Sequence, residues 1–238
     1  MRRALAVVGV LAVLAVGLAC GGGGDDGAVD GALAGFCLPA RAPASGQGTY
    51  YDADGTGNCS FPADSTRMVA AINAADYGTA SWCGACLAVT GPIGDVVVRV
   101  TDQCPGCAKG DLDLSKEAFA KIAAISAGRV AITWHEVDCP VSGPISYEMK
   151  SGSSQYYAAI QVRNHRYPIA NLEAMAPGAA YKPINRVDYN YFVAASGLGP
   201  GPYSLRVTDT RGNMIEDSGI AIGDGVVRTG ASQFPICP

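Results

Sequence analysis

The chain has 238 residues, 49% of them hydrophobic, with 31 glycines and 14 prolines, so its composition predicts a globular protein rich in turns. Acidic residues outnumber basic ones by 21 to 17, and the formal net charge is −4. No cluster of lysines and arginines occurs, which argues against nucleic acid as a partner. Any binding to acidic polymers would have to be local.

The first 20 residues predict a secretory signal peptide of the lipoprotein type. A charged start, Met1-Arg-Arg, precedes an apolar run from Ala4 to Leu18 that is too short to span a bilayer. The run ends in Gly17-Leu-Ala-Cys20, which resembles the lipobox in which the cysteine is lipidated, although that motif usually has leucine at the position of Gly17. The alternative is an ordinary cleaved signal followed by an unrelated cysteine.

Residues 21–36 predict a flexible tether, because Gly21 to Ala34 is rich in Gly, Asp and Ala and has no apolar periodicity. We therefore expect an extracellular or cell-surface monomer that reaches a membrane only through a lipid anchor on Cys20.

Nine cysteines are an odd number, and assigning Cys20 to a lipid leaves eight, an even set for disulfides. Eight cysteines allow 105 pairings, so spacing alone leaves the connectivity open. Cys83-Gly-Ala-Cys86 and Cys104-Pro-Gly-Cys107, 17 residues apart, also fit a zinc ribbon, and either pair fits a redox motif. Export favours disulfides over thiolates, so we expect neither metal nor cofactor.

From Cys37 to about Pro140, short extended segments alternate with turns and one helix. The predicted strands are Gly48 to Tyr51, Cys86 to Val89, Val96 to Thr101 and Val130 to Val137. Ser115 opens a predicted helix that starts at Lys116, whereas Met68 to Ala74 fits a helix or a strand. One helix among many strands predicts a small barrel over residues 37–140.

Two aspartates follow the strand that ends at Thr101. Period-two alternation predicts Asp102 on the same face as Val96, Val98 and Val100. Beyond a sharp turn at Cys104 to Cys107, Asp113 alternates with leucines in a short extended segment. Asp102 and Asp113 could thus meet across one turn, and the alternative is that they only cap turns.

After Cys139-Pro140 the pattern changes to regularly spaced strands. These are Ser146 to Met149, Gln155 to Arg163, Val187 to Val193, Tyr203 to Val207 and Met214 to Ile215, with Thr210-Arg-Gly-Asn213 as a hairpin turn. No cysteine lies between Cys139 and Cys237. Residues 141–238 therefore predict a second all-β domain, a sandwich.

Tyrosines of this second domain could stack on sugar rings. Tyr156 and Tyr157 are adjacent and can both face outward only at a bulge or at the start of a strand. Tyr189 and Tyr191 share one face of their predicted strand, with Lys150 nearby in sequence. The alternative is ordinary cross-strand packing.

Four runs carry a family resemblance that covers about Gly46 to Pro238. They are T-D-x-C-P-G-C-A-x-G-D-L-D-L-S, I-T-W-x-x-V-D-C-P, S-G-S-S-x-Y-Y-A-A-I-Q-V-R-N-H-x-Y-P and V-D-Y-N-Y-F. Together they resemble the bacterial and fungal expansin-like proteins. The resemblance implies an all-β fold, a six-stranded double-psi β-barrel followed by an immunoglobulin-like β-sandwich that binds carbohydrate. Family members bind plant-type cell walls, chiefly cellulose and related polysaccharides, and loosen them without hydrolysis.

The resemblance also implies roles for residues at matching positions. Asp113 corresponds to the essential acid of the barrel, Asp102 to its partner acid and Thr49 to a supporting threonine. The sandwich platform corresponds to Tyr156, Tyr157 and Tyr189, with Lys150 as a surface lysine. Better-known bacterial members have tryptophans in place of Tyr156 and Tyr157 and a groove tyrosine in place of Cys104. Cysteine-containing relatives imply the pairs Cys59–Cys83 and Cys86–Cys139. The remaining four cysteines could pair in three ways, and of these we expect Cys104–Cys107 with Cys37–Cys237.

Three other functions stay open. The barrel also resembles certain endoglucanases, in which the base lies four residues after the matching threonine, at Ala53 here. Inverting hydrolysis needs a second carboxylate about 6.5 to 9.5 Å from the acid, and Asp52 and Asp54 flank Ala53. Lytic transglycosylases have related barrels and need no such base, but they usually lack the second domain. A surface adhesin would need the tyrosines but not Asp113.

Overall fold

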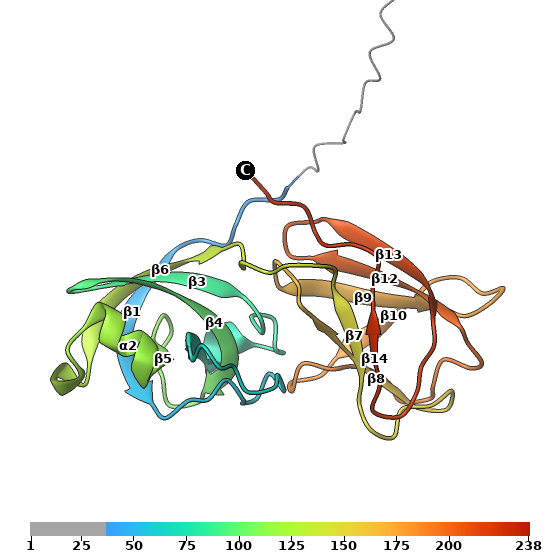
Figure 1. Ribbon diagram of the computed structural model, residues 1–238, viewed down its shortest axis with the longest axis horizontal. Coiled ribbons are helices and arrows are strands. Elements are labelled where there is room, and N and C mark those ends of the chain that lie inside the picture. The colour runs from blue at the N-terminus through green and yellow to red at the C-terminus, as the bar shows by residue number, and fades with distance from the viewer. Residues whose placement is uncertain (1–36) are drawn as a thin grey trace, which may run out of the picture. The chain divides into compact units, whose positions relative to one another are not determined.

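The computed structural model describes residues 37–238, and its first half is a closed six-stranded barrel (Figure 1). Its strands are β1 (Ala44–Tyr51), β2 (Val69–Asn73), β3 (Cys86–Gly91), β4 (Gly94–Cys104), β5 (Leu112–Ser115) and β6 (Val130–Val137), closed in the order β1-β5-β2-β4-β3-β6. β1 runs parallel to β5 and β2 runs parallel to β4, while the remaining pairs are antiparallel. This confirms the predicted barrel.

The helices of the barrel half are α1 (Ala74–Tyr77), α2 (Lys116–Ile122) and the 3-10 turn η1 (Ile125–Ala127). Ser115 caps α2 as predicted, since its Oγ accepts the amide of Ala118 at 3.1 Å, and α2 buries Phe119 and Ile122 in the barrel core. The ambiguous segment from Met68 contains both elements: a fully buried strand β2, and then α1, whose first turn is capped by Asn73. None of the helices in residues 37–238 is long and apolar enough to cross a bilayer.

The second half has eight antiparallel strands, hydrogen-bonded in the order β13-β12-β9-β10-β11-β8-β7-β14. The strands are β7 (Ser146–Met149), β8 (Ala158–Arg163), β9 (Ile169–Met175), β10 (Lys182–Arg186), β11 (Phe192–Ala194), β12 (Tyr203–Asp209), β13 (Met214–Ile220) and β14 (Val227–Thr229). One buried cluster joins side chains from both ends of this order, including Tyr147 and Ile160 on one side and Leu172, Leu205 and Val207 on the other. The strands thus form the predicted sandwich, and Thr210 to Asn213 forms the predicted hairpin turn.

The predicted strand Val187 to Val193 is wrong. β10 ends at Arg186 and β11 begins at Phe192, and the turn between them is closed by the amide of Val187, which donates to the carbonyl of Tyr191 at 2.8 Å. Asn190 takes a φ of 63°, a conformation that asparagine tolerates better than most residues. Tyr189 therefore lies on a turn instead of along a strand.

Four disulfides link the described cysteines: Cys37–Cys237, Cys59–Cys83, Cys86–Cys139 and Cys104–Cys107. Cys59–Cys83 and Cys86–Cys139 are the pairs that the family resemblance implied, and the other two are the pairs expected for the remaining cysteines. Because both C-x-x-C motifs are oxidised, the zinc-ribbon interpretation is wrong, and no group of three or more metal-ligating side chains occurs within residues 37–238. The predicted signal peptide, Cys20 and the tether lie outside the described residues.

Candidate functional site

Thr49, Asp113, Ala71 and Asp102 occupy one row across four neighbouring strands of the barrel. Thr49 on β1 pairs with Asp113 on β5, and Ala71 on β2 pairs with Asp113 on one side and with Asp102 on the other. The two acids therefore flank β2 and do not meet directly across the turn that joins β4 to β5. The small side chain of Ala71 lies between them.

A β-bulge puts Asp102 in this row. Ala70 pairs with Val100, but Ala71 pairs with Asp102, so Thr101 is an extra residue on β4. Val98 and Val100 point into the barrel core with Ala70, whereas Asp102 shares the level of Ala71, which is outside that core cluster. The prediction that Asp102 shares the face of the even-numbered valines is therefore wrong, because alternation does not continue across the bulge.

Asp113 is the acid whose protonation the barrel alters. Its side chain is half-buried, and Thr49 Oγ1 donates a hydrogen bond to its Oδ1 at 2.6 Å. Burial raises the pKa of Asp113 above its ordinary value, and the negative charge of Asp102 adds to the rise. The hydrogen bond from Thr49 and the positive charge of Arg129 oppose it. Asp113 thus keeps its proton to a higher pH than an exposed aspartate does.

Asp102 is held in place by donors. Its Oδ1 accepts the backbone amides of Asn58 at 2.7 Å and Gln103 at 2.8 Å, and its Oδ2 faces the hydroxyl of Tyr51 at 3.4 Å. Sequence reasoning missed Tyr51, although it follows Thr49 at the two-residue spacing that puts both side chains on one face of β1. Burial, followed by the charge of Asp102, raises the pKa of Tyr51, so its hydroxyl stays protonated.

The position that the resemblance matches to an endoglucanase base holds no carboxylate in this chain. Ala53 is there, and it is buried. Of its two neighbours, Asp52 is exposed. Asp54 accepts two hydrogen bonds from Thr56, one from the backbone amide at 2.9 Å and one from the side-chain hydroxyl at 2.5 Å. These two bonds lower the pKa of Asp54. Asp54 is therefore engaged within its own turn.

The predicted tyrosine platform is only partly exposed. Tyr156 is 76% exposed, Tyr157 and Tyr189 are half-buried, and both members of the adjacent pair precede the first residue of β8. The ammonium of Lys150 lies 4.5 Å from the ring centroid of Tyr189. Tyr191 is different, because it is buried and donates its hydroxyl to Glu148 at 3.3 Å. These positions leave Tyr156, Tyr157, Tyr189 and Lys150 as the accessible set.

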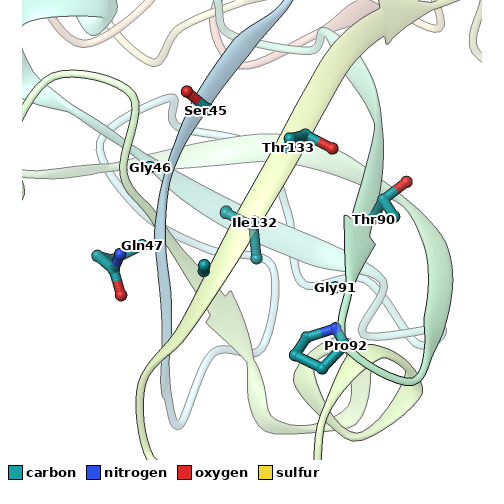
Figure 2. Close-up of a pocket in the computed structure, with 9 residues that line it drawn as sticks. Ser45, Gly46, Gln47, Thr90, Gly91, Pro92, Ile132 and Thr133 are labelled. Carbon is teal, nitrogen blue, oxygen red and sulfur yellow. The ribbon is translucent and has the colours of Figure 1, made fainter.

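A separate depression of about 580 Å³ lies over β1, β3 and β6 of the barrel. Figure 2 shows the small polar side chains of Ser45, Thr90 and Thr133 around it, together with Pro92. No titratable side chain lines it, so it supplies no acid or base. The two predicted acids, Asp102 and Asp113, lie elsewhere on the barrel, in the row with Thr49.

Comparisons with curated proteins and with solved structures both find expansins, and a domain-family model matches the barrel. Residues 44–134 match a domain family described as lytic transglycolase. Expansin-YoaJ of Bacillus subtilis is 39% identical over 195 residues, which cover 77% of this chain and 83% of that protein. The crystal structure of the apo expansin of Clavibacter michiganensis superposes with a TM-score of 0.76 at 36% identity, over 82% of this chain and all of that one. A mutant of the same Clavibacter protein, solved in complex with cellohexaose, matches equally well.

Proposed function

Because the chain belongs to the expansin family, we propose that it is an exported protein that binds cellulose and loosens plant-type cell walls without hydrolysing them. The observation that carries the proposal is the asymmetry of the barrel row: one protonatable acid, Asp113, beside a fixed acid, Asp102, with Ala53 at the position of a hydrolase base.

Binding is assigned to the sandwich. Tyrosine rings present flat apolar faces with a polar edge, which suits the apolar faces of sugar rings and their hydroxyl rims. Tyr156, Tyr157 and Tyr189 provide such rings, and Lys150 adds a donor beside Tyr189. The Clavibacter relative in complex with cellohexaose supports a β-glucan as the ligand class.

Loosening is assigned to Asp113. A protonated carboxyl can donate a hydrogen bond to a glucan oxygen and thereby compete with a hydrogen bond between two glucan chains. Hydrolysis would require a second carboxylate that activates water. Ala53 cannot do this, and the oxygens of Asp102 already accept hydrogen bonds from Asn58 and Gln103 and face Tyr51. The acid would therefore weaken contacts between chains without cleaving them.

The deciding experiment combines two measurements on the purified protein. Loss of mechanical strength in cellulose paper or heat-inactivated plant walls, with no soluble sugar released, is the expected result. Release of reducing sugar that disappears in Asp52→Asn or Asp54→Asn would establish a hydrolase instead. Release of muropeptides from peptidoglycan would establish a lytic transglycosylase, and binding without any loss of strength would establish an adhesin.

We further propose that Cys20 anchors the exported protein through a lipid. The odd number of cysteines supports this, because the other eight all pair with one another in the described structure.

A further inference from the structure

Arg99 is a partly buried cation that the described part of the chain does not pair. It lies on β4 between the core residues Val98 and Val100, so its side chain leaves the barrel on the opposite face. Its Nε and Nη2 are buried and have no hydrogen-bond partner. Among residues 37–238, no carboxylate oxygen lies within 4.0 Å of its guanidinium. Buried donors and charges of this kind cost free energy until a partner satisfies them.

The guanidinium of Arg99 borders two adjoining cavities. One has a volume of about 340 Å³ and is also lined by Phe61, Thr101 and Arg163, and the other has a volume of about 240 Å³. Thr101, the bulged residue of β4, has a buried hydroxyl that also lacks a partner. Two neighbouring side chains on the wall of one cavity thus have unused hydrogen-bonding capacity.

Arg163 does not supply the missing negative charge but adds a second positive one. It forms an ion pair with Glu148, and its Nε donates to Gln161 at 2.6 Å. Burial is the largest cause and lowers the pKa of Arg99, the negative charge of Asp64 opposes it, and the positive charge of Arg163 lowers the pKa further. An anion entering the cavity would therefore meet one arginine in an ion pair and a second, Arg99, whose guanidinium lies over the ring of Phe61 at 4.6 Å but has no carboxylate of residues 37–238 within 4.0 Å.

Asp64 narrows the class of ligand. It lines both cavities, and its Oδ1 accepts the amide of Thr66 at 2.8 Å and its hydroxyl at 2.7 Å. A carboxylate here disfavours a simple inorganic anion, but it can accept hydrogen bonds from hydroxyls. The cavity therefore suits a molecule that carries a carboxylate and hydroxyls on the same ring.

We propose that this cavity binds a uronic acid residue of an acidic wall polysaccharide, with the sugar carboxylate on the guanidinium of Arg99 and a sugar hydroxyl on Asp64. A planar guanidinium can bind a carboxylate through two parallel hydrogen bonds. The site is distinct from the tyrosine platform and recognises charge. The overall acidity of the chain does not oppose it, because the attraction is local. This proposal rests on the proposed function only for the kind of target, a plant-type cell wall.

The test uses isothermal titration of the full chain with trigalacturonate, and fully methyl-esterified trigalacturonate serves as the matched neutral ligand. We expect the acid to bind, its affinity to fall with added salt, and the ester to bind about tenfold more weakly or not at all. Arg99→Gln should weaken binding of the acid about tenfold, whereas Arg228→Gln, a matched change on β14, should have no effect.

Asp64→Asn keeps a side-chain oxygen for Thr66, removes the negative charge and turns the other oxygen, the acceptor proposed for the sugar hydroxyl, into a donor. It should therefore raise the affinity for inorganic sulfate more than the affinity for trigalacturonate, so that sulfate becomes a better competitor. This variant keeps the proposal testable if Arg99→Gln fails to fold. Equal affinity for acid and ester, or equal binding by Arg99→Gln and wild type, would overturn the proposal. So would sulfate competing as well as the sugar acid in the wild type. Cellohexaose binding measured in parallel tests the glucan proposal separately, since Arg99 variants should leave it unchanged.

Discussion

Asp102 and Asp113 occupy the same register position on opposite sides of β2, each paired with Ala71. Their backbones are therefore two strand spacings apart, roughly 9 to 10 Å. The two carboxylates have different hydrogen-bond donors. Asp102 accepts hydrogen bonds from two backbone amides. Asp113 accepts one from the hydroxyl of Thr49, and its pKa is raised. One row of the barrel thus holds one carboxylate bound by backbone amides and a second, Asp113, whose pKa is raised.

Replacing Asp113 with asparagine should abolish wall loosening and leave cellulose binding intact, because the amide cannot act as the acid and binding is assigned to the sandwich. Since burial raises the pKa of Asp113, its ionised form destabilises the fold at neutral pH, and the variant should melt at an equal or higher temperature. Loss of strength in paper strips and a cellulose-binding isotherm measure the two effects. Asp95→Asn, at the exposed β3–β4 hairpin, is the control. Loosening at the wild-type rate in Asp113→Asn would exclude the acid.

Loosening should increase as the pH falls through the pKa of Asp113, which lies above that of an exposed aspartate. Thr49→Val removes a hydrogen bond that favours the ionised form, so the pKa should rise further and the pH profile should shift to higher pH. The ¹³C shift of the Asp113 carboxyl during a pH titration measures this directly. Thr133→Val, at an exposed position of β6, should not move the profile. A shift to lower pH in Thr49→Val would contradict the assignment.

Truncating each platform tyrosine to alanine should weaken cellulose binding roughly fivefold or more, because the analogous stacking of a nucleic-acid base on an aromatic side chain contributes ~1 to 3 kcal/mol. Tyr156 should tolerate the change with little loss of stability, since it is 76% exposed. Tyr181→Ala is the matched control, because this ring stacks on Arg206 at the other end of β10 from Tyr189. Unchanged isotherms in the triple variant would mean that the platform does not bind glucan.

The protein should lose stability in acid through His165. Burial, with the charge of Arg99 as the next cause, lowers the pKa of this histidine to about 3. In the unfolded chain His165 binds a proton below about pH 6.5, whereas in the folded protein it does so only near pH 3. The free energy of unfolding therefore falls as the pH drops between these two values, by roughly 4 to 5 kcal/mol in total. His165→Asn should flatten this part of the stability profile, as measured by urea unfolding between pH 3 and 7. Parallel profiles for variant and wild type would contradict the prediction.

Replacing Cys20 with serine should move the exported protein from the membrane fraction to the aqueous phase of a detergent partition, because a single lipidated cysteine is the proposed attachment. Mass spectrometry of the mature N-terminus provides an independent readout. A wild-type protein found wholly in the aqueous phase would show that Cys20 carries no lipid.

Alternation and turn chemistry predicted most of the barrel strands, the Ser115 cap and the hairpin turn at Thr210 to Asn213. These two sequence patterns gave wrong predictions where the backbone departs from regular strand geometry. The extra residue at Thr101 reverses the face of Asp102, and the turn at Asn190 splits a predicted strand and moves Tyr189 onto a loop. Tyr51 and Arg99 could not be selected from the sequence, because their importance comes from a carboxylate and a cavity that only the fold brings next to them.

The disulfide between Cys37 and Cys237 determines where a mechanical load on the N-terminal side of the chain enters the fold. It joins residues 200 positions apart, and next to it Leu38 exchanges hydrogen bonds with Arg211 in the β12–β13 turn. Tension applied to the chain ahead of Cys37 therefore passes first into the C-terminal end of the sandwich and does not peel β1 from the barrel. β1, the strand that carries Thr49, would therefore keep its register against β5 when the chain is pulled from this end.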